Sequence, residues 1–269
     1  MTDLSGKVAV VTGASRGVGK GVAAGLAEAG ATVYATGRTV SEECFTDAFE
    51  GDGRIVPVRC DHTDDGETEA VFKRVAEEHG RLDVLVNSAW GGYERFTDGT
   101  PFNPGPFWEQ PLALWDSMHR IGLRAHYVTT ALAAPLLIAA RGLVVSVSSF
   151  AGQVVVPPVP YGVAHAAIDR LARDMAEDFR PHGVTSVSLY PGLVLTESVL
   201  ANIEHFAHEP NRETPLFVGR VVAALAADPD ALRLTGRWLV AAELAADYGV
   251  TDEHGVLPHS NRRAILGEE

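Results

Sequence analysis

A glycine-rich turn near the amino terminus is the first feature whose residue types and spacing could do chemistry. The motif Thr12–Gly19 follows the apolar run Val8–Val11 and opens an alanine-rich segment. Backbone N–H groups and the positive end of a helix dipole would therefore face a bound pyrophosphate. Gly13 permits a tight turn, Gly17 lets a phosphate approach, and Gly19 allows close helix–strand packing. The turn predicts a dinucleotide site formed by Gly13, Ser15, Arg16, Gly17, Val18 and Gly19.

The same residues permit a second interpretation. Gly13-Ala-Ser15-Arg-Gly17 matches the G-x-S-x-G elbow that carries the nucleophile of α/β hydrolases, again between a strand and a helix. That elbow normally follows several strands and needs an acid and a histidine further along the chain. Its position at residue 13 favours the dinucleotide site.

A basic residue after the second apolar run predicts which dinucleotide binds. In Tyr34-Ala-Thr-Gly37-Arg38, glycine stands where NAD enzymes usually place the carboxylate that binds the ribose hydroxyls. An arginine next to it can bind a 2′-phosphate, and Arg16 could form the opposite side of the clamp. Together these residues indicate NADP(H).

Two other groups of side chains have weaker claims to chemistry. His205 and His208 could share a metal, but no third ligand at a suitable spacing accompanies them, so a solvated helix face is favoured. The segment 90–111 is rich in glycine, proline and aromatic residues and follows a predicted strand. With Val154–Val156 and Tyr190 it could wall an apolar pocket; an ordinary packed or subunit-facing loop is the alternative.

Seven apolar runs alternate with helical patterns, which is typical of βαβ units and a parallel sheet. The predicted strands are Val8–Val11, Thr32–Thr36, Arg54–Arg59, Val84–Val86, Leu143–Val147, Thr185–Leu189 and Trp238–Val240. The predicted helices are Gly17–Ala29, Asp64–His79 with Thr63 as N-cap, Trp115–Ala140 and Tyr161–Arg180. We expect one α/β domain over 1–269, a doubly wound Rossmann fold with a seven-stranded parallel sheet, and functional loops at 90–111 and 197–214.

Composition narrows the partners and the compartment. The net charge of −13 argues against nucleic acid and anionic membranes, because both repel an acidic surface. The two cysteines, Cys44 and Cys60, suit a reducing compartment. No basic and apolar leader begins the chain, and the apolar stretch Thr130–Ala140 is shorter than the roughly 20 residues that span a bilayer. We expect a cytoplasmic protein.

From about Leu4 to Tyr248 the sequence resembles the short-chain dehydrogenase/reductase family. Beyond the glycine turn, the matching residues are Asp61, Asn87-Ser-Ala89, Ser149, Tyr161 twelve positions later, and Pro191-Gly-Leu-Val-Leu-Thr196. Thr36-Gly-Arg38, Gly122-Leu-Arg124 and Pro160-Tyr-Gly-Val163 are most similar to one subgroup of that family.

The resemblance implies a role for each matching residue. It places Asp61 and the backbone of His62 at the adenine, and Asn87, Ser88 and Ala89 on the adenosine ribose side, where they also stabilise the sheet. Ser149 would orient a substrate carbonyl, and Tyr161 would transfer a proton. The residues implied for the nicotinamide end are Pro191, Gly192, Val194 and Thr196.

Two positions depart from the family pattern. Its Tyr-x-x-x-Lys motif becomes Tyr161-Gly-Val-Ala-His165, which keeps one helical turn between the pair but replaces the lysine that binds the nicotinamide ribose. The helical asparagine of the family aligns with Gly122. A histidine is mostly neutral at pH 7, so we expect His165 to support alcohol oxidation poorly. At mildly acidic pH, where it can be charged and partly replace the lysine, we expect it to favour carbonyl reduction.

The sequence therefore predicts an NADP(H)-dependent reductase that acts on an aldehyde or ketone of an apolar small molecule. Because two of the four catalytic positions differ, a catalytically weak NADP(H)-binding protein with a sensing or scaffolding role is the alternative. Apolar and small residues surround much of the last two predicted helices, and together with the family resemblance they imply a homodimer or homotetramer that pairs through these helices. Those residues include Ala164, Ala167, Ile168, Leu171, Met175 and Phe179.

Overall fold

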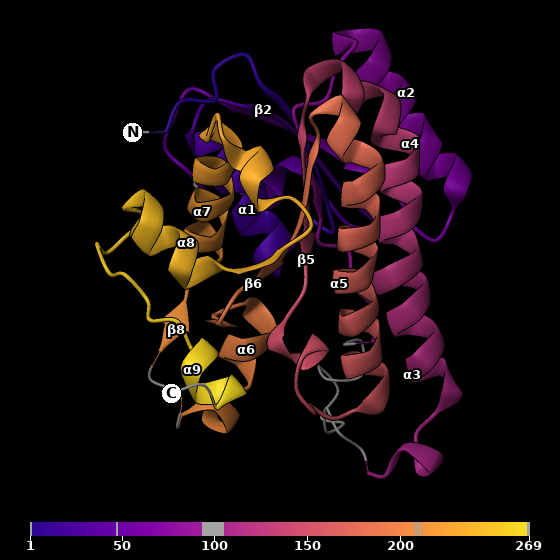
Figure 1. The fold of residues 1–269 in the computed structure, drawn as a ribbon, viewed down its shortest axis with the longest axis vertical. Helices are drawn as coiled ribbons and strands as arrows, with labels where there is room; N and C mark the ends of the chain where they lie inside the picture. The colour runs from indigo at the N-terminus through magenta and orange to yellow at the C-terminus, as the bar shows by residue number, and fades with distance from the viewer. Residues whose placement is uncertain (1, 47, 93–104, 208, 210, 268–269) are drawn as a thin grey trace.

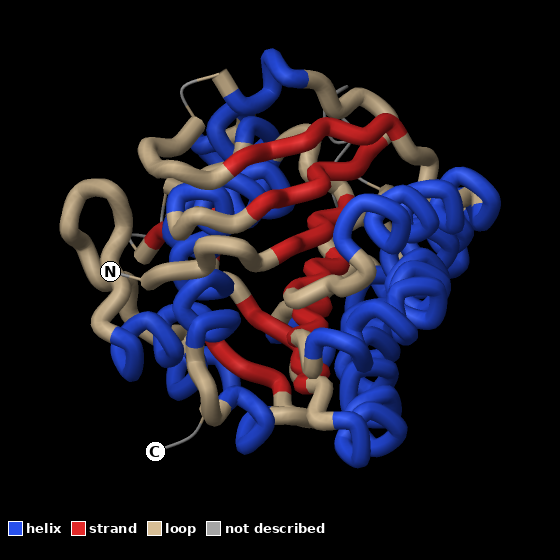
Figure 2. The backbone as a smooth tube through the Cα atoms, turned by 90° about the horizontal axis from the view of Figure 1, so that it is seen from above, coloured by secondary structure: helices blue, strands red, loops and turns tan. Residues whose placement is uncertain are grey.

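Seven parallel strands form the central sheet in the order β3-β2-β1-β4-β5-β6-β9 (Figure 2). The computed structural model describes residues 2–46, 48–92, 105–207, 209 and 211–267. The predicted doubly wound seven-stranded sheet is confirmed, with its crossover between β1 and β4. The strands are β1 (Val8–Thr12), β2 (Thr32–Gly37), β3 (Arg54–Arg59), β4 (Val84–Asn87), β5 (Leu143–Val147), β6 (Thr185–Tyr190) and β9 (Trp238–Val240).

Alternate residues of the central strands enter two separate cores. In β1, Ala9 and Val11 belong to one apolar cluster, whereas Val8 and Val10 belong to the other. Both sheet faces are therefore buried, which explains why the central strands are continuously apolar.

Helices cover both faces of the sheet, with α2, α4 and α5 on one side and α1, α7 and α8 on the other (Figure 1). Their bounds are α1 (Gly17–Glu28), α2 (Asp65–His79), α4 (Ala125–Ala140), α5 (Val159–Phe179), α7 (Pro215–Ala227) and α8 (Ala241–Tyr248). The prediction of Thr63 as an N-cap is wrong. Asp64 caps α2 by accepting from the backbone N–H groups of Gly66 and Glu67.

The helix predicted over 115–140 begins earlier and is not uniform. It runs through α3 (Leu112–Ser117), a π-helical turn at Met118–Arg124, and α4. The run Leu112–Ala140 is long and apolar enough to cross a membrane by length and composition. Here α4 packs against α2, β4 and β5, so its apolar composition has an explanation within the fold.

Residues that were expected to form a pairing face on α5 have a different placement. Ala164, Ile168 and Phe179 are buried within the chain, so these three do not support that prediction. Ala167, Leu171 and Met175 are half-buried. Outward-facing apolar side chains on α4 and α5 are instead Tyr127, Ile138, Val159 and Val163.

Short elements gather at the carboxyl edge of the sheet. The predicted loop 197–214 contains α6 (Glu197–Ala201), a 3-10 turn (Ile203–Phe206) and β8 (Arg212–Glu213), which pairs with β7 (Leu193–Val194). Together with α3 and α9 (Arg262–Leu266), α6 lies toward the lower end of Figure 1. Glu197 of α6 accepts a hydrogen bond from Gly17 just after β1, and Leu266 of α9 packs in the apolar cluster of Tyr190 at the end of β6.

Candidate active site

The glycine turn is fixed by close backbone contacts at the ends of β1 and β4. A Cβ on Gly13 would lie 2.7 Å from Ala89 Cα, and one on Gly19 would lie 2.4 Å from the Gly13 carbonyl oxygen. Only glycine fits either position. The hydroxyl oxygen of Thr12 accepts hydrogen bonds from the backbone N–H groups of Ser88 (3.0 Å) and Ala89 (3.1 Å). Thr12 thus joins the two strands that flank the turn.

An anionic side chain occupies the start of α1. The N–H of Gly17, which has a left-handed φ of 59°, donates to Glu197 Oε2 at 2.9 Å. Thr196 lies against the same glycine, 3.3 Å from a Cβ placed there, and caps α6 through the N–H of Val199. A carboxylate on this backbone amide shows that the turn can hold an anion, so its geometry fits a pyrophosphate.

The two arginines predicted to bind the cofactor are both exposed, Arg16 within the glycine turn and Arg38 directly after β2. Gly37 ends β2 and is buried, and a Cβ there would lie 3.5 Å from the Ser15 hydroxyl oxygen. A hydrogen bond from the Thr63 backbone is the largest cause that lowers the pKa of Asp61, and the charge of Arg38 lowers it further. Arg38 and Asp61 therefore share the edge formed by β2 and β3.

Residues predicted for the adenosine side use their side chains within the protein. The imidazole of His62 is buried, with Nε2 2.7 Å from the Thr36 hydroxyl, and burial lowers its pKa to about 4. Asn87 donates to the Thr130 hydroxyl at 3.0 Å and accepts from the Thr129 hydroxyl at 2.5 Å. These bonds tie the end of β4 to α4.

Ser149 and Tyr161 lie on adjoining elements at the end of β5. Ser149 caps a 3-10 turn (Phe150–Gly152) by accepting from the N–H of Ala151 at 3.2 Å. That turn packs against α5, whose first turn carries Tyr161. Both side chains are half-buried. A hydroxyl and a phenol on packed elements at this edge can together polarise and protonate a carbonyl oxygen.

His165 lies beneath an indole ring and is shielded from solvent. Its imidazole stacks on Trp90 with ring centroids 4.6 Å apart and an interplanar angle of 10°. Its centroid is 4.4 Å from that of Tyr161, and Nδ1 is 3.3 Å from the Ser148 hydroxyl. Burial lowers the pKa of His165 to about 3. The expectation that His165 becomes charged at mildly acidic pH is therefore wrong.

Gly122 leaves room for the same indole. A Cβ at this position would lie 2.5 Å from the Trp90 ring. Gly122 belongs to the π-helical turn, a local widening that is frequent at functional sites. Trp90, Gly122 and His165 thus form one packed unit beside Tyr161, and an asparagine at 122 would not fit with the indole in place.

A carboxyl group one turn beyond His165 supports the turn that carries Ser149. Asp169 accepts from the Tyr190 hydroxyl and, at 3.2 Å, from Gln153 Nε2. A Cβ on Gly152 would lie 2.4 Å from Asp169 Oδ2. Burial is the largest cause that raises the pKa of Asp169, against several hydrogen bonds that lower it.

The apolar pocket expected beside this site is only partly described. Tyr190 is fully buried in the cluster with Asp169, so its predicted place in the pocket wall is wrong. Val155 is almost fully exposed, and Phe107 and Trp108 are largely exposed. The rings of Phe107 and Trp108 meet edge to face, with their centroids 5.2 Å apart. Tyr93, Phe96 and Phe102, and also His208, lie outside the described residues.

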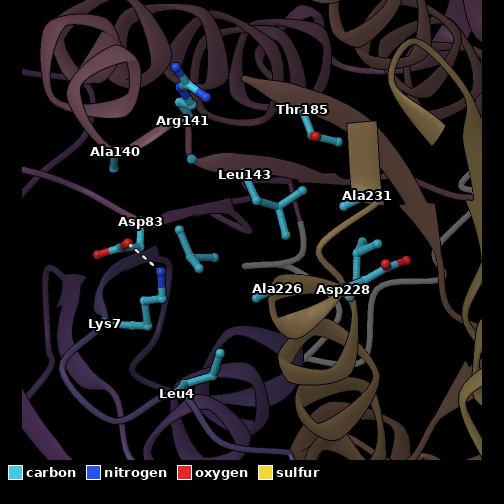
Figure 3. Close-up of a pocket in the computed structure, with 13 residues that line it drawn as sticks. Leu4, Lys7, Asp83, Ala140, Arg141, Leu143, Thr185, Ala226, Asp228 and Ala231 are labelled. Carbon is cyan, nitrogen blue, oxygen red and sulfur yellow. Dashed lines mark hydrogen bonds and ion pairs between the residues drawn. The ribbon is translucent and has the colours of Figure 1, made fainter. Parts of the chain in front are cut away.

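A surface pocket shown in Figure 3 lies at the opposite edge of the sheet. Val84, Leu143 and Thr185, which line it, are the first residues of β4, β5 and β6. Two of its charged groups pair with each other, with Lys7 Nζ 3.1 Å from Asp83 Oδ1. Since ligands of open α/β sheets bind at the carboxyl ends of the strands, this pocket is not the candidate active site.

A family model described as short chain dehydrogenase matches residues 7–205 of the sequence. The chain belongs to the short chain dehydrogenase family. Its predicted resemblance to that family is thereby confirmed.

Known relatives agree with this assignment. The dehydrogenase is 44% identical to dehydrogenase/reductase SDR family member 1 of Mus musculus, over 94% of this chain and 85% of that protein. It is 41% identical to the Homo sapiens protein of the same name, with the same coverage. The subgroup predicted from Thr36–Arg38, Gly122–Arg124 and Pro160–Val163 is this member 1.

A solved structure of 7α-hydroxysteroid dehydrogenase, complexed with NADH and 7-oxo glycochenodeoxycholic acid, resembles the dehydrogenase in fold. It is 26% identical, with a TM-score of 0.75, over 89% of this chain and 94% of that chain.

Several residues of the dehydrogenase's site were not predicted from its sequence. Thr12 could have been found, because it precedes the glycine turn directly. Asp169 could also have been found, since it continues the four-residue spacing of Tyr161 and His165 along one helix face. The Glu197 contact joins positions 180 residues apart, and no local pattern indicates it.

Proposed function

We propose that this short chain dehydrogenase uses NADP(H) to reduce an aldehyde or ketone of an apolar small molecule. The observation that carries the proposal is the packing of the Ser149 turn against the Tyr161 helix, at the same sheet edge as an anion-binding glycine turn. A proton donor and a dinucleotide site at one edge are what carbonyl reduction requires.

Gly37 and Arg38 support NADP(H) as the cofactor. The buried Gly37 offers no carboxylate to the ribose hydroxyls, and Arg38 is exposed at the end of β2. A guanidinium binds phosphate through charge-assisted, paired hydrogen bonds. Arg38 lies close enough to Asp61 to lower its pKa, beyond the larger effect of the Thr63 backbone. The family resemblance places Asp61 at the adenine, so Arg38 would lie on the same side of the cofactor.

The residues present support a simple sequence of events. When bound, the reduced nicotinamide supplies a hydride to the carbonyl carbon. The Ser149 hydroxyl donates a hydrogen bond to the carbonyl oxygen and orients it. Tyr161 donates its phenolic proton to that oxygen as negative charge develops there. The buried, neutral His165 supports the ring of Tyr161 by packing and adds no charge.

An apolar substrate fits the surroundings of the site. Phe107 and Trp108, shortly before α3, and Leu112, its first residue, expose large apolar side chains. Exposed apolar groups that lie together on a surface favour an apolar ligand. The similar 7α-hydroxysteroid dehydrogenase was solved with an oxo bile acid, which is also a largely apolar ketone.

A second candidate function rests on His165 and Gly122. Because a neutral imidazole and a glycine stand at two of the four catalytic positions of the family, the protein could bind NADP(H) and work by sensing or scaffolding. Measurable carbonyl turnover that depends on Tyr161 separates the two functions.

The test is NADPH consumption with a panel of apolar aldehydes and ketones. We expect turnover, and we expect Tyr161→Phe to reduce it by about 10²–10⁴-fold, the usual contribution of a general acid. Binding of NADPH without turnover on any panel member would favour the sensing role.

Arg38→Ala tests the choice of cofactor. A charge-assisted hydrogen bond contributes about 1.5–3 kcal/mol to binding. Its loss should weaken NADPH binding roughly ten- to a hundredfold and leave NADH binding nearly unchanged. Fluorescence titration measures the dissociation constants of NADPH and NADH. Equal losses for the two cofactors would disprove the phosphate clamp.

We propose further that the protein is cytoplasmic and forms a homodimer or homotetramer. Cys44 and Cys60 are both free thiols, which suits a reducing compartment. Outward-facing apolar side chains on α4 and α5, such as Tyr127 and Val163, support pairing through these helices.

A further inference from the structure

One buried carboxyl group has no role in the chemistry described so far. Glu213 lies in β8 with 1% of its surface exposed, and β8 pairs with β7 in the segment that follows Gly192. The Glu213 carbonyl accepts from the N–H of Leu195 at 2.8 Å. Its side chain turns toward Gly192, where a Cβ would lie 2.9 Å from Oε1. Glu213 is thus built into the Pro191–Thr196 segment.

The carboxyl group is only half satisfied. The backbone N–H of Gly192 forms a hydrogen bond with it, whereas Oε2 is buried and has no hydrogen-bond partner among the described residues. Burial raises the pKa of Glu213 to about 7. Since an apolar side chain would fill a buried position at lower cost, an unpaired acid here calls for a functional explanation.

Charged groups on the adjoining elements are engaged elsewhere. Arg212, next in β8, donates to the carbonyls of Phe206 and Glu209. Glu197 at the start of α6 accepts from the Gly17 N–H, and Glu253 accepts from the Thr214 hydroxyl. Tyr190 at the end of β6 donates to Asp169, and Arg220 of α7 pairs with Glu28. Within the described part of the chain, no cation pairs with Glu213.

We propose that Glu213 determines how strongly the site distinguishes the oxidised from the reduced nicotinamide ring. The oxidised ring carries a positive charge and the reduced ring is neutral. A buried carboxylate attracts only the charged ring, and a buried carboxylic acid favours neither by charge. This inference rests on the proposed use of NADP(H) and on the family role of Gly192 at the nicotinamide end.

The direction of the pH dependence follows from the linkage between ionisation of Glu213 and binding of the cofactor. A folded protein whose Glu213 ionises near pH 7 holds a neutral acid at pH 6 and a carboxylate at pH 8.5. Bound NADP⁺ favours the carboxylate, so NADP⁺ should bind more tightly, relative to NADPH, as the pH rises through this range. Below pH 7 the site should release the oxidised product more readily.

The experiment compares the dissociation constants of NADP⁺ and NADPH for the full chain at pH 6.0 and pH 8.5. Both ligands carry the same adenosine, 2′-phosphate and pyrophosphate, so the titration of those groups cancels in the ratio Kd(NADP⁺)/Kd(NADPH). We expect this ratio to fall about three- to tenfold between the two pH values, which corresponds to a linked pKa change of roughly half a unit to one unit.

Variants assign the effect to one carboxyl group. Glu213→Gln keeps the shape and cannot ionise, so its ratio should be the same at both pH values. Glu213→Met, an apolar chain of similar length, should give the same flat result and serves if the glutamine variant does not fold. Glu253→Gln removes an exposed carboxylate nearby and should keep the wild-type fall.

The possible results are distinct. A ratio that does not change with pH in the wild type, or that still falls in the foldable Glu213 variants, overturns the role of Glu213 and leaves the proposed function intact. Failure of the wild type to bind either NADP⁺ or NADPH overturns the proposed function and this inference with it.

Discussion

A lysine at position 165 should strengthen alcohol oxidation only when the indole of Trp90 is removed at the same time. The imidazole of His165 is 5% exposed and stacks on Trp90 at 4.6 Å. Burial lowers its pKa to about 3, which makes it neutral throughout pH 5.5–9. The same burial would favour the neutral amine of a lysine and remove the charge that the substitution is meant to supply.

The size of the effect follows from the tyrosine's task. Alcohol oxidation needs a tyrosinate, and a cation within about 4–6 Å typically lowers the pKa of an acid by 1–3 units. A charged lysine should therefore raise oxidation at pH 7 by about ten- to a thousandfold, because the ionised fraction of a phenol rises by that factor. Reduction starts from the protonated phenol and should change by less than about tenfold.

Initial rates of NADP⁺ reduction by an alcohol and of NADPH oxidation by a carbonyl give both directions across pH 5.5–9. The set is wild type, His165→Lys, Trp90→Ala and the double variant. We expect the large gain in oxidation only in the double variant, as a non-additive pair. A full gain in His165→Lys alone, or none in the double variant, would refute the account of the stacked pair.

The remaining predictions concern the phosphate turn, acid stability and assembly. Glu197→Gln should tighten NADPH binding several-fold, because it removes the anion that holds the Gly17 N–H; unchanged or weaker binding in a fluorescence titration contradicts this. Burial lowers the pKa values of His62, His126 and His165 in the folded protein to about 4, 4 and 3. As the pH falls below about 6.5, these histidines therefore bind protons in the unfolded chain before they do so in the folded protein. The free energy of unfolding should drop between pH 6.5 and 4.5, by up to about 1.4 kcal/mol per pH unit per histidine, and His126→Asn should reduce the slope measured by urea denaturation. Light scattering at micromolar concentration should show a dimer or tetramer; a monomer alone refutes pairing through α4 and α5.

Strands were predictable because their signal is local. Runs such as Val8–Val11 and Leu143–Val147 are buried on both faces, which requires continuous apolar residues and leaves little ambiguity. Helix ends were less predictable. Asp64 rather than Thr63 caps α2, although either residue type can do so, because the choice depends on which backbone N–H groups each side chain reaches.

Contacts between distant segments could not be predicted from the sequence. The departures at Gly122 and His165 were visible, but their common contact was not, because the indole of Trp90 reaches both only after the chain folds. Glu213 gave no signal either. A glutamate two residues before a proline resembles any helix approach, and its burial depends on the pairing of β8 with β7.

Two independent features of the site bias it in the same direction. A neutral imidazole stands where the family has a lysine, so the charge that would favour a tyrosinate, and with it alcohol oxidation, is missing. If Glu213 acts at the nicotinamide end as proposed, its protonation below about pH 7 removes electrostatic support from the oxidised ring. The neutral His165 favours the protonated form of Tyr161, and a protonated Glu213 would favour the release of NADP⁺. Carbonyl reduction needs both a protonated acid and release of the oxidised product. A cation beside Tyr161 and an ionised Glu213 should therefore each favour alcohol oxidation, the first by stabilising the tyrosinate and the second by strengthening the binding of NADP⁺.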